Sequence, residues 1–125
     1  MNSEYTVSII IPTYNSEKTI RSCLEKVTKE SKLLKSELIV VDDCSTDQTI
    51  EIIKTFQDIK LIKLKSNLGA GNARNKGAET AMYENLCFID SDIHISEESI
   101  LNLVKRLKKD NYTGSVAAIP DVTNL

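Results

Sequence analysis

The chain alternates short apolar runs with amphipathic stretches along most of its length. β-Branched and other apolar runs predict five strands, over residues 7–11, 38–41, 59–64, 86–89 and 114–119. Between them, apolar residues recur at helical spacing and predict four helices, over residues 20–27, 45–56, 70–82 and 96–107. The run at 86–89 predicts a buried strand, whereas the apolar–lysine alternation at 59–64 favours an edge or half-buried strand.

Strands that alternate with helices predict a mostly parallel sheet covered on both faces, a three-layer α/β/α sandwich. Ser45-Thr46-Asp47-Gln48 fits a capping box at the start of the second predicted helix. Ala73, Gly77 and Ala81 form a stripe of small residues that would let the third helix lie close to the sheet. With 125 residues and no internal repeat or linker, we expect residues 1–125 to form a single domain.

Composition excludes some classes of function. The net charge is -2 and no basic patch dominates, so nucleic acid is not an expected partner. No apolar run approaches the length of a membrane span, and residues 1–4 lack the features of a signal peptide. The three cysteines form no CxxC motif and are expected to be reduced, which favours the cytoplasm or the cytoplasmic face of a membrane.

Polar residues gather where the first four predicted strands end. These clusters are residues 13–15, 42–43, 67–74 and 90–92. In α/β sheets, ligands bind at the carboxyl ends of the strands, so clusters that follow different strands should meet at one rim. We therefore expect a ligand site at this rim.

Asp90 and Asp92 are the most informative pair in these clusters. On an extended chain, residues two apart point to the same side, about 6 to 7 Å from each other. At an effective dielectric constant of about 20, their charges would repel by roughly 2 to 3 kcal/mol. A hard divalent cation or a hydrogen-bonding ligand is the usual compensation, although acidic pairs are also common on surfaces.

The other clusters admit both a structural and a functional interpretation. One carboxylate of Asp42-Asp43 can cap the next helix, and the second suits a ligand donor such as a nucleobase N–H. The glycine loop at residues 67–71 precedes a helix N-terminus, where free N–H groups attract anions, but it can equally be an ordinary turn. Arg74 could reach a diphosphate with two hydrogen bonds. Tyr14 suits a half-buried loop as well as a contact with a base.

Several other nucleotide-binding α/β classes lack support in this chain. A dinucleotide-binding domain needs GxGxxG after its first strand, where this chain has Pro12-Thr13-Tyr14. No P-loop motif (GxxxxGK followed by Ser or Thr) is present. The acidic pair follows the second strand and not the first, unlike that of a receiver domain. The glycine-rich loop of sugar nucleotidyltransferases is also missing after the first strand.

Together, the clusters resemble the N-terminal half of a family 2 glycosyltransferase with the GT-A fold, which is Rossmann-like. VSIIIPTYN at residues 7–15 is similar to the family's first strand and loop, and LIVVDDCSTD at residues 38–47 resembles its VVDDGSTD segment. NLGAGNARNKG at residues 67–77 resembles NxGxxxARNxG, and FIDSD at residues 88–92 resembles the strand that ends in the DXD motif. Cys44 departs from the pattern, because the family commonly has glycine there.

The resemblance implies that the chain binds a nucleotide-diphospho-sugar, with a UDP-sugar as the first expectation, together with Mg²⁺ or Mn²⁺. Thr13 and Tyr14 would surround the nucleoside, and Asp43 would accept from the base. Arg74 would lie beside the base or the phosphates. The implied donor-binding residues are Pro12, Thr13, Tyr14, Asp42, Asp43, Asn67, Gly69, Arg74 and Asp90. The implied metal-binding residues are Asp92 and Asp90, with Asp90 placed near the ribose or a metal-bound water.

The family continues past the fifth strand into an acceptor-binding half, which supplies the general base of inverting enzymes. We therefore expect a truncated GT-A domain whose general base and whose saccharide or lipid-linked acceptor site lie beyond Leu125. A sheet edge left open in this way would favour self-association. Two alternatives are a non-catalytic module that binds nucleotide-sugar or assists assembly, and an α/β enzyme of the nucleotidyltransferase type.

Overall fold

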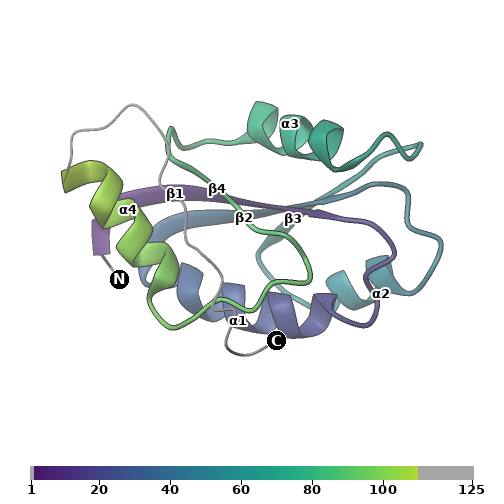
Figure 1. Ribbon diagram of the computed structural model, residues 1–125, viewed down its shortest axis with the longest axis horizontal. Helices are drawn as coiled ribbons and strands as arrows, with labels where there is room; N and C mark the ends of the chain where they lie inside the picture. Colours follow the sequence, from purple (N-terminus) through teal and green to yellow (C-terminus); the bar gives the residue numbers. More distant parts are fainter. Residues whose placement is uncertain (1, 110–125) are drawn as a thin grey trace.

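A computed structural model describes residues 2–109, and the strands in this range form one parallel sheet (Figure 1). They are β1 (Asn2–Thr13), β2 (Leu34–Asp42), β3 (Ile59–Lys63) and β4 (Leu86–Phe88). Their order in the sheet is β3-β2-β1-β4, and each neighbouring pair is parallel. The predicted parallel sheet is confirmed, and so is the edge position of β3. The strand predicted at residues 114–119 lies outside the described residues.

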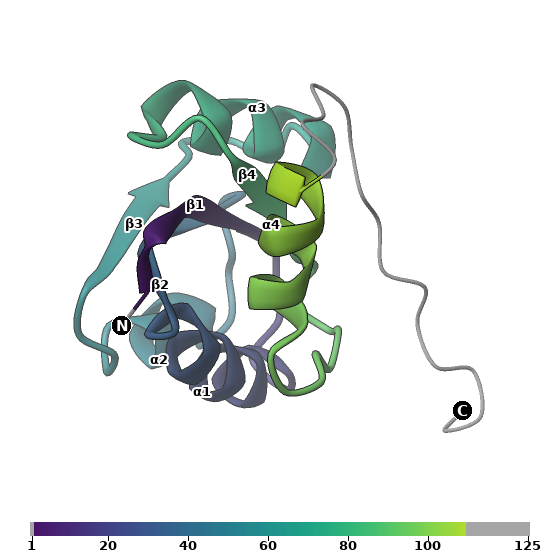
Figure 2. The same cartoon turned by 90° about the vertical axis from the view of Figure 1, so that its left-hand side faces the viewer.

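Helices cover both faces of the sheet, as Figure 2 shows. On one side, α3 (Ala70–Thr80) packs on β1 and β2. On the other side lie α1 (Ile20–Ser31), α2 (Thr49–Ile53) and α4 (Ser99–Lys109), with α1 in contact with both of its neighbours. The predicted three-layer α/β/α sandwich is therefore confirmed. None of the described helices is both long and apolar enough to cross a membrane.

The core is divided between the two faces of β1, because successive side chains of a strand point to opposite sides. Ile9 and Ile11 join the larger core on the side of α1 and α4, and Ile10 joins a smaller core under α3. All three side chains are fully buried. Burial of each contributes roughly 1.5–3 kcal/mol, so this run holds β1 firmly between the two helix layers.

α3 lies close to the sheet because Gly77 has no side chain. A Cβ at this position would overlap Cγ2 of Ile10 and would lie 3.3 Å from Cγ2 of Val41. Ala73, one turn earlier, is fully buried. The predicted role of the small-residue stripe is confirmed, and it places the first turns of α3 beside the carboxyl end of β1.

Two predicted helices begin later than their sequence patterns indicated. α2 has five residues, and residues 45–48 form a loop instead of the predicted capping box. The hydroxyl of Ser45 donates to Asp42 instead, and Asp47 accepts the N–H of Thr49 where α2 begins. The helix predicted from residue 96 begins at Ser99, because Glu98 adopts a φ of 59° that interrupts the helical backbone.

β4 is an edge strand among the described residues, and not the buried strand that its apolar run predicted. Leu86 and Phe88 are 39% and 46% exposed. Phe88 is paired with Ile10 and shares its face of the sheet, but α3 packs over β1 and β2 on that face. An apolar run shows what a strand can bury, whereas the neighbouring elements decide whether it is covered.

Candidate functional site

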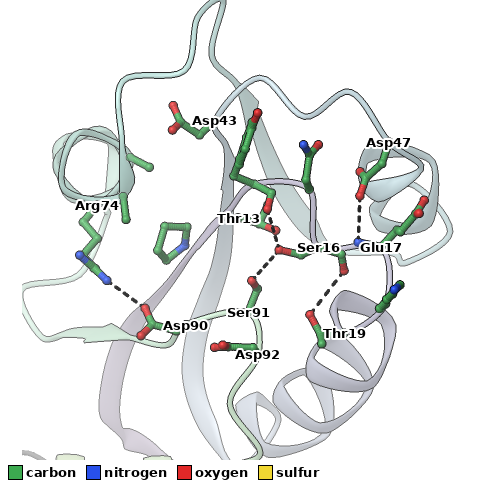
Figure 3. A pocket seen from close by; sticks show the side chains of 16 residues that line it. Thr13, Ser16, Glu17, Thr19, Asp43, Asp47, Arg74, Asp90, Ser91 and Asp92 are labelled. Atoms are coloured by element: carbon green, nitrogen blue, oxygen red, sulfur yellow. Dashed lines mark hydrogen bonds and ion pairs between the residues drawn. The ribbon is translucent and has the colours of Figure 1, made fainter.

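The carboxyl ends of β1, β2 and β4 surround an open pocket of about 690 Å³ (Figure 3). Its walls are the last two residues of β1 with residues 14–19 after it, Asp43 and Asp47 after β2, the first turns of α3, and residues 90–92 after β4. The predicted site residues that it brings together are Pro12, Thr13, Tyr14, Asp43, Arg74, Asp90 and Asp92. Asp42, Asn67 and Gly69 do not line it.

The loop after β1 is hydrogen-bonded to the loop after β2. The N–H of Asn15 donates to Oγ of Ser45 at 2.9 Å, and Oδ1 of Asn15 accepts the N–H of Thr46 at 2.8 Å. The N–H of Ser16 donates to Oγ1 of Thr49 at 2.8 Å. These bonds join residues about thirty positions apart in sequence and build one continuous wall of the pocket.

Glu17 and Asp47 reinforce the same wall. The N–H of Glu17 donates to Asp47 at 3.3 Å, and the N–H of Gln48 donates to Glu17 at 3.0 Å. Desolvation raises the pKa of Asp47, but the hydrogen bonds from Thr49 and Glu17 outweigh it and hold this pKa below its ordinary value. Asp47 is therefore a charged part of the wall, and it also accepts the N–H of Thr49, the first residue of α2, at 2.9 Å.

Asp42 is a structural residue of the loop after β2. Its carboxylate is fully buried and accepts hydrogen bonds from the N–H of Ser45 at 2.9 Å and from its Oγ at 2.5 Å. Adjacent side chains on a strand point to opposite sides, so only one residue of the Asp42-Asp43 pair can face the pocket. The expectation that Asp42 also contacts the ligand is not supported by this geometry. Cys44 follows the pair with a φ of 69°, a backbone conformation that glycine adopts more easily.

Asp43 joins the pocket to the glycine loop before α3. Although it is only 3% exposed, it lines the pocket, and its two carboxylate oxygens accept the N–H groups of Leu68 and Gly69 at 3.0 and 2.8 Å. Gly69 has a φ of 98°, which requires glycine. The part of the glycine loop before α3 therefore supports Asp43 without lining the pocket itself. The N–H groups of Leu68 and Gly69 are already bonded to this carboxylate and are not available to an anion.

Arg74 and Asp90 form an ion pair at the edge of the pocket, with 2.9 Å between Nη2 and Oδ1. The two side chains are 38% and 51% exposed. Exposed pairs of this kind contribute only about 0–1 kcal/mol to stability, so a ligand could exchange with either partner at little cost.

Ser91, between the two predicted carboxylates, makes a contact that the sequence did not predict. Its Oγ lies 2.9 Å from Oγ of Ser16, across the pocket wall (Figure 3). Asp92, the next residue, is exposed and makes no hydrogen bond or ion pair within residues 2–109. Behind this loop, desolvation and then the charge of Asp92 raise the pKa of the Cys23 thiol to about 11, so this cysteine is a neutral part of the core.

Thr13 carries a polar group that is left unpaired. The residue lines the pocket and is 3% exposed, yet its Oγ1 is buried without a hydrogen-bond partner among the described residues. Leaving a buried hydroxyl unpaired costs about 1–3 kcal/mol. This observation points to a ligand that completes the hydrogen bonding of Thr13.

The carboxylates do not form a ready metal cage. Across residues 2–109, no three His, Cys, Asp or Glu side chains come close enough to hold a metal together. Mg²⁺ and ions like it are commonly held by one or two carboxylates together with substrate phosphates and water. The unpaired carboxylate of Asp92 fits that second arrangement.

Comparison with known proteins decides the family. The family model for glycosyl transferase family 2 matches residues 8–124. The chain belongs to this family. It is 40% identical over 98 residues to the poly(ribitol-phosphate) beta-N-acetylglucosaminyltransferase TarS of Staphylococcus aureus strain Mu50. That match covers 74% of this chain and 17% of TarS, and the chain spans 17% to 29% of the length of the curated relatives it matches.

Solved structures confirm the predicted GT-A fold of this family 2 domain. Residues 1–349 of S. aureus TarS in complex with UDP match with a TM-score of 0.77 and 31% identity, covering 93% of this chain and 38% of that chain. The mannosyltransferase PcManGT from Pyrobaculum calidifontis, in complex with GDP-Man and Mn²⁺, matches with a TM-score of 0.73 and 29% identity. This second match covers 81% of this chain and 32% of that chain.

Proposed function

We propose that residues 1–125 form the donor-binding domain of an inverting glycosyltransferase, and that this domain binds a UDP-sugar together with Mg²⁺ or Mn²⁺. The observation that carries the proposal is the convergence of Asp43, Arg74 and Asp92 on one pocket at the carboxyl ends of three strands. Family membership adds support, as do the UDP in the TarS structure and the GDP-Man and Mn²⁺ in the PcManGT structure.

In this proposal the nucleoside lies against the loop after β1. Tyr14 is 46% exposed and offers an aromatic surface to the base. The unpaired hydroxyl of Thr13 would bond to the nucleoside, and Asp43 would accept a base N–H with the lone pairs that Leu68 and Gly69 leave free. Arg74 would leave its ion pair to contact the base or a phosphate, which would free Asp90 for the ribose.

The diphosphate would lie beside Asp92. A bound divalent cation would neutralise the charge that develops on the diphosphate as the sugar leaves. Asp92 would hold that cation, and residues 90–91 would keep the carboxylate in place. The general base, and the binding of a saccharide or lipid-linked acceptor, would belong to a part of the protein outside residues 1–125.

Calorimetric titration of this chain with UDP, GDP and dTDP, each with and without Mn²⁺, tests the proposal. We expect UDP to bind most tightly and Mn²⁺ to strengthen its binding, and we expect Asp92→Asn to abolish the gain from Mn²⁺. Asp58→Asn is the matched control, because Asp58 is exposed at the amino end of β3, away from the pocket. Equal binding of UDP by the wild type and Asp92→Asn in Mn²⁺ would show that the site is assigned wrongly.

A further inference from the structure

The Asp90-Ser91-Asp92 segment is fixed at two of its residues and free at the third. The carboxylate of Asp90 is paired with Arg74 at 2.9 Å, and its carbonyl oxygen accepts the N–H of Ile93 at 3.2 Å. Ser91 contacts Ser16 through the two hydroxyl oxygens at 2.9 Å. Asp92 makes no such contact within the described part of the chain, so its carboxylate is held by its neighbours and not by a partner of its own.

Ser16 is itself well anchored, which makes it a suitable fixed point. Its N–H donates to Thr49, and its carbonyl oxygen accepts the N–H groups of Thr19 and Ile20 at 3.0 and 2.8 Å, where α1 begins. Its hydroxyl donates to the carbonyl oxygen of Tyr14 at 3.2 Å. Either hydroxyl of the two serines can donate in the bond between them, and Ser16 is held in place in both cases by its backbone bonds.

We propose that Ser91 is a positioning residue, and that its hydrogen bond to Ser16 holds the Asp92 carboxylate where a cation on a nucleoside diphosphate can reach it. This inference rests on the proposed function. Figure 3 shows the bond crossing from the loop after β4 to the loop after β1, directly beside Asp92. Without the bond, residues 91–92 keep more conformational freedom, and binding of the cation has to overcome that entropy.

Ser91 should affect only the binding that depends on a cation. The Asp92 carboxylate matters only when a cation is present, whereas Thr13, Tyr14 and Asp43 would act with or without it. Loss of the Ser91 hydroxyl should therefore weaken UDP binding in Mn²⁺ by about five- to tenfold, the effect of one net hydrogen bond. In EDTA the same variant should bind UDP within about twofold of the wild type.

The experiment is a calorimetric UDP titration in Mn²⁺ and in EDTA, with thermal melting of every variant to check folding. Ser91→Ala is the main variant, and Ser91→Thr should restore affinity because it keeps a hydroxyl. Ser22→Ala is the matched control, since Ser22 is exposed on α1 and does not line the pocket. Ser16→Ala combined with Ser91→Ala should be no weaker in Mn²⁺ than the weaker single variant, because both changes remove the same bond.

Three results would overturn the inference in distinguishable ways. If Ser91→Ala binds UDP as tightly as the wild type in Mn²⁺, the hydroxyl of Ser91 has no role in binding. An equal loss in Mn²⁺ and in EDTA shows that Ser91 acts on the nucleoside or on the whole pocket, and not on the cation. A wild-type chain whose UDP affinity does not respond to Mn²⁺ removes the proposed cation site itself, and this inference with it.

Discussion

Asp42 and Asp43 are neighbours in sequence with opposite tasks in the structure. The carboxylate of Asp42 is buried in its own loop, where it bonds to Ser45, while Asp43 lines the pocket and holds the glycine loop. The difference follows from the alternation of side chains at a strand end. At the scale of single residues, Thr13 and Asp92 differ from these two, because their side-chain oxygens have no hydrogen-bond partner within residues 2–109.

Thr13 should show opposite effects on stability and on binding. Thr13→Val keeps the shape of the side chain and removes the unpaired buried hydroxyl. We expect the free energy of unfolding to rise by about 1 kcal/mol and UDP affinity to fall about fivefold or more. Urea unfolding and calorimetry measure the two effects, and Thr13→Ser should keep the affinity. If Thr13→Val binds UDP as the wild type does, the hydroxyl has no part in recognition.

At the scale of elements, the position of α3 depends on the missing side chain of Gly77. Gly77 allows the helix to lie against Ile10 and Val41, which places Arg74 beside the pocket. Gly71, at the start of the same helix, is not required by packing, because a Cβ there would meet no other atom within 4 Å.

A pair of glycine substitutions in α3 separates packing from helix propensity. Gly77→Ala should lower the free energy of unfolding by about 1–3 kcal/mol, because the added methyl group overpacks the contact with Ile10. Gly71→Ala should raise it by up to about 1 kcal/mol, since alanine favours the helix and meets no neighbour. Urea denaturation measures both, and two changes of the same sign would contradict the close packing of α3.

Sequence reasoning identified the elements better than the contacts between them. The β-branched runs at Val7 to Ile11 and Leu38 to Val41 indicated two central strands, and the carboxyl-end rule then placed most of the pocket correctly. The length of α2 was wrong because residues 45–48 bond to a loop thirty positions away. Ser16 and Ser91 lie 75 positions apart, and no local pattern of residues indicates that they touch.

At the scale of the whole molecule, Glu37 on β2 connects several elements, at a point far from the pocket. Its side chain is 12% exposed and accepts hydrogen bonds from the hydroxyl of Ser8 on β1 at 2.6 Å, from Lys60 on β3 at 3.3 Å, and from the N–H of Met82. Burial raises the pKa of Glu37, but these three groups outweigh it and hold this pKa below its ordinary value of 4.5.

The lowered pKa of Glu37 predicts a pH dependence of stability. The folded state binds a proton less readily than the unfolded state, so the contribution is fully present above about pH 4.5 and is lost as the pH falls through the folded-state pKa. Glu37→Gln should cost about 1–2 kcal/mol at pH 7, and this difference should shrink below pH 4.5. Urea unfolding across this range checks it, with the exposed Glu84→Gln as control. A difference that stays constant with pH would contradict the assignment.

The hydrogen bonds between the loops after β1 and β2 should slow the exchange of their amide hydrogens in the free protein. The amides of Asn15, Ser16 and Thr46 belong to surface loops, yet each donates to a side-chain oxygen on a distant part of the chain. In deuterium oxide they should be protected before any nucleotide is added, whereas ordinary loop amides label at once. A recognition surface that is already rigid in solution loses little further freedom when its ligand arrives.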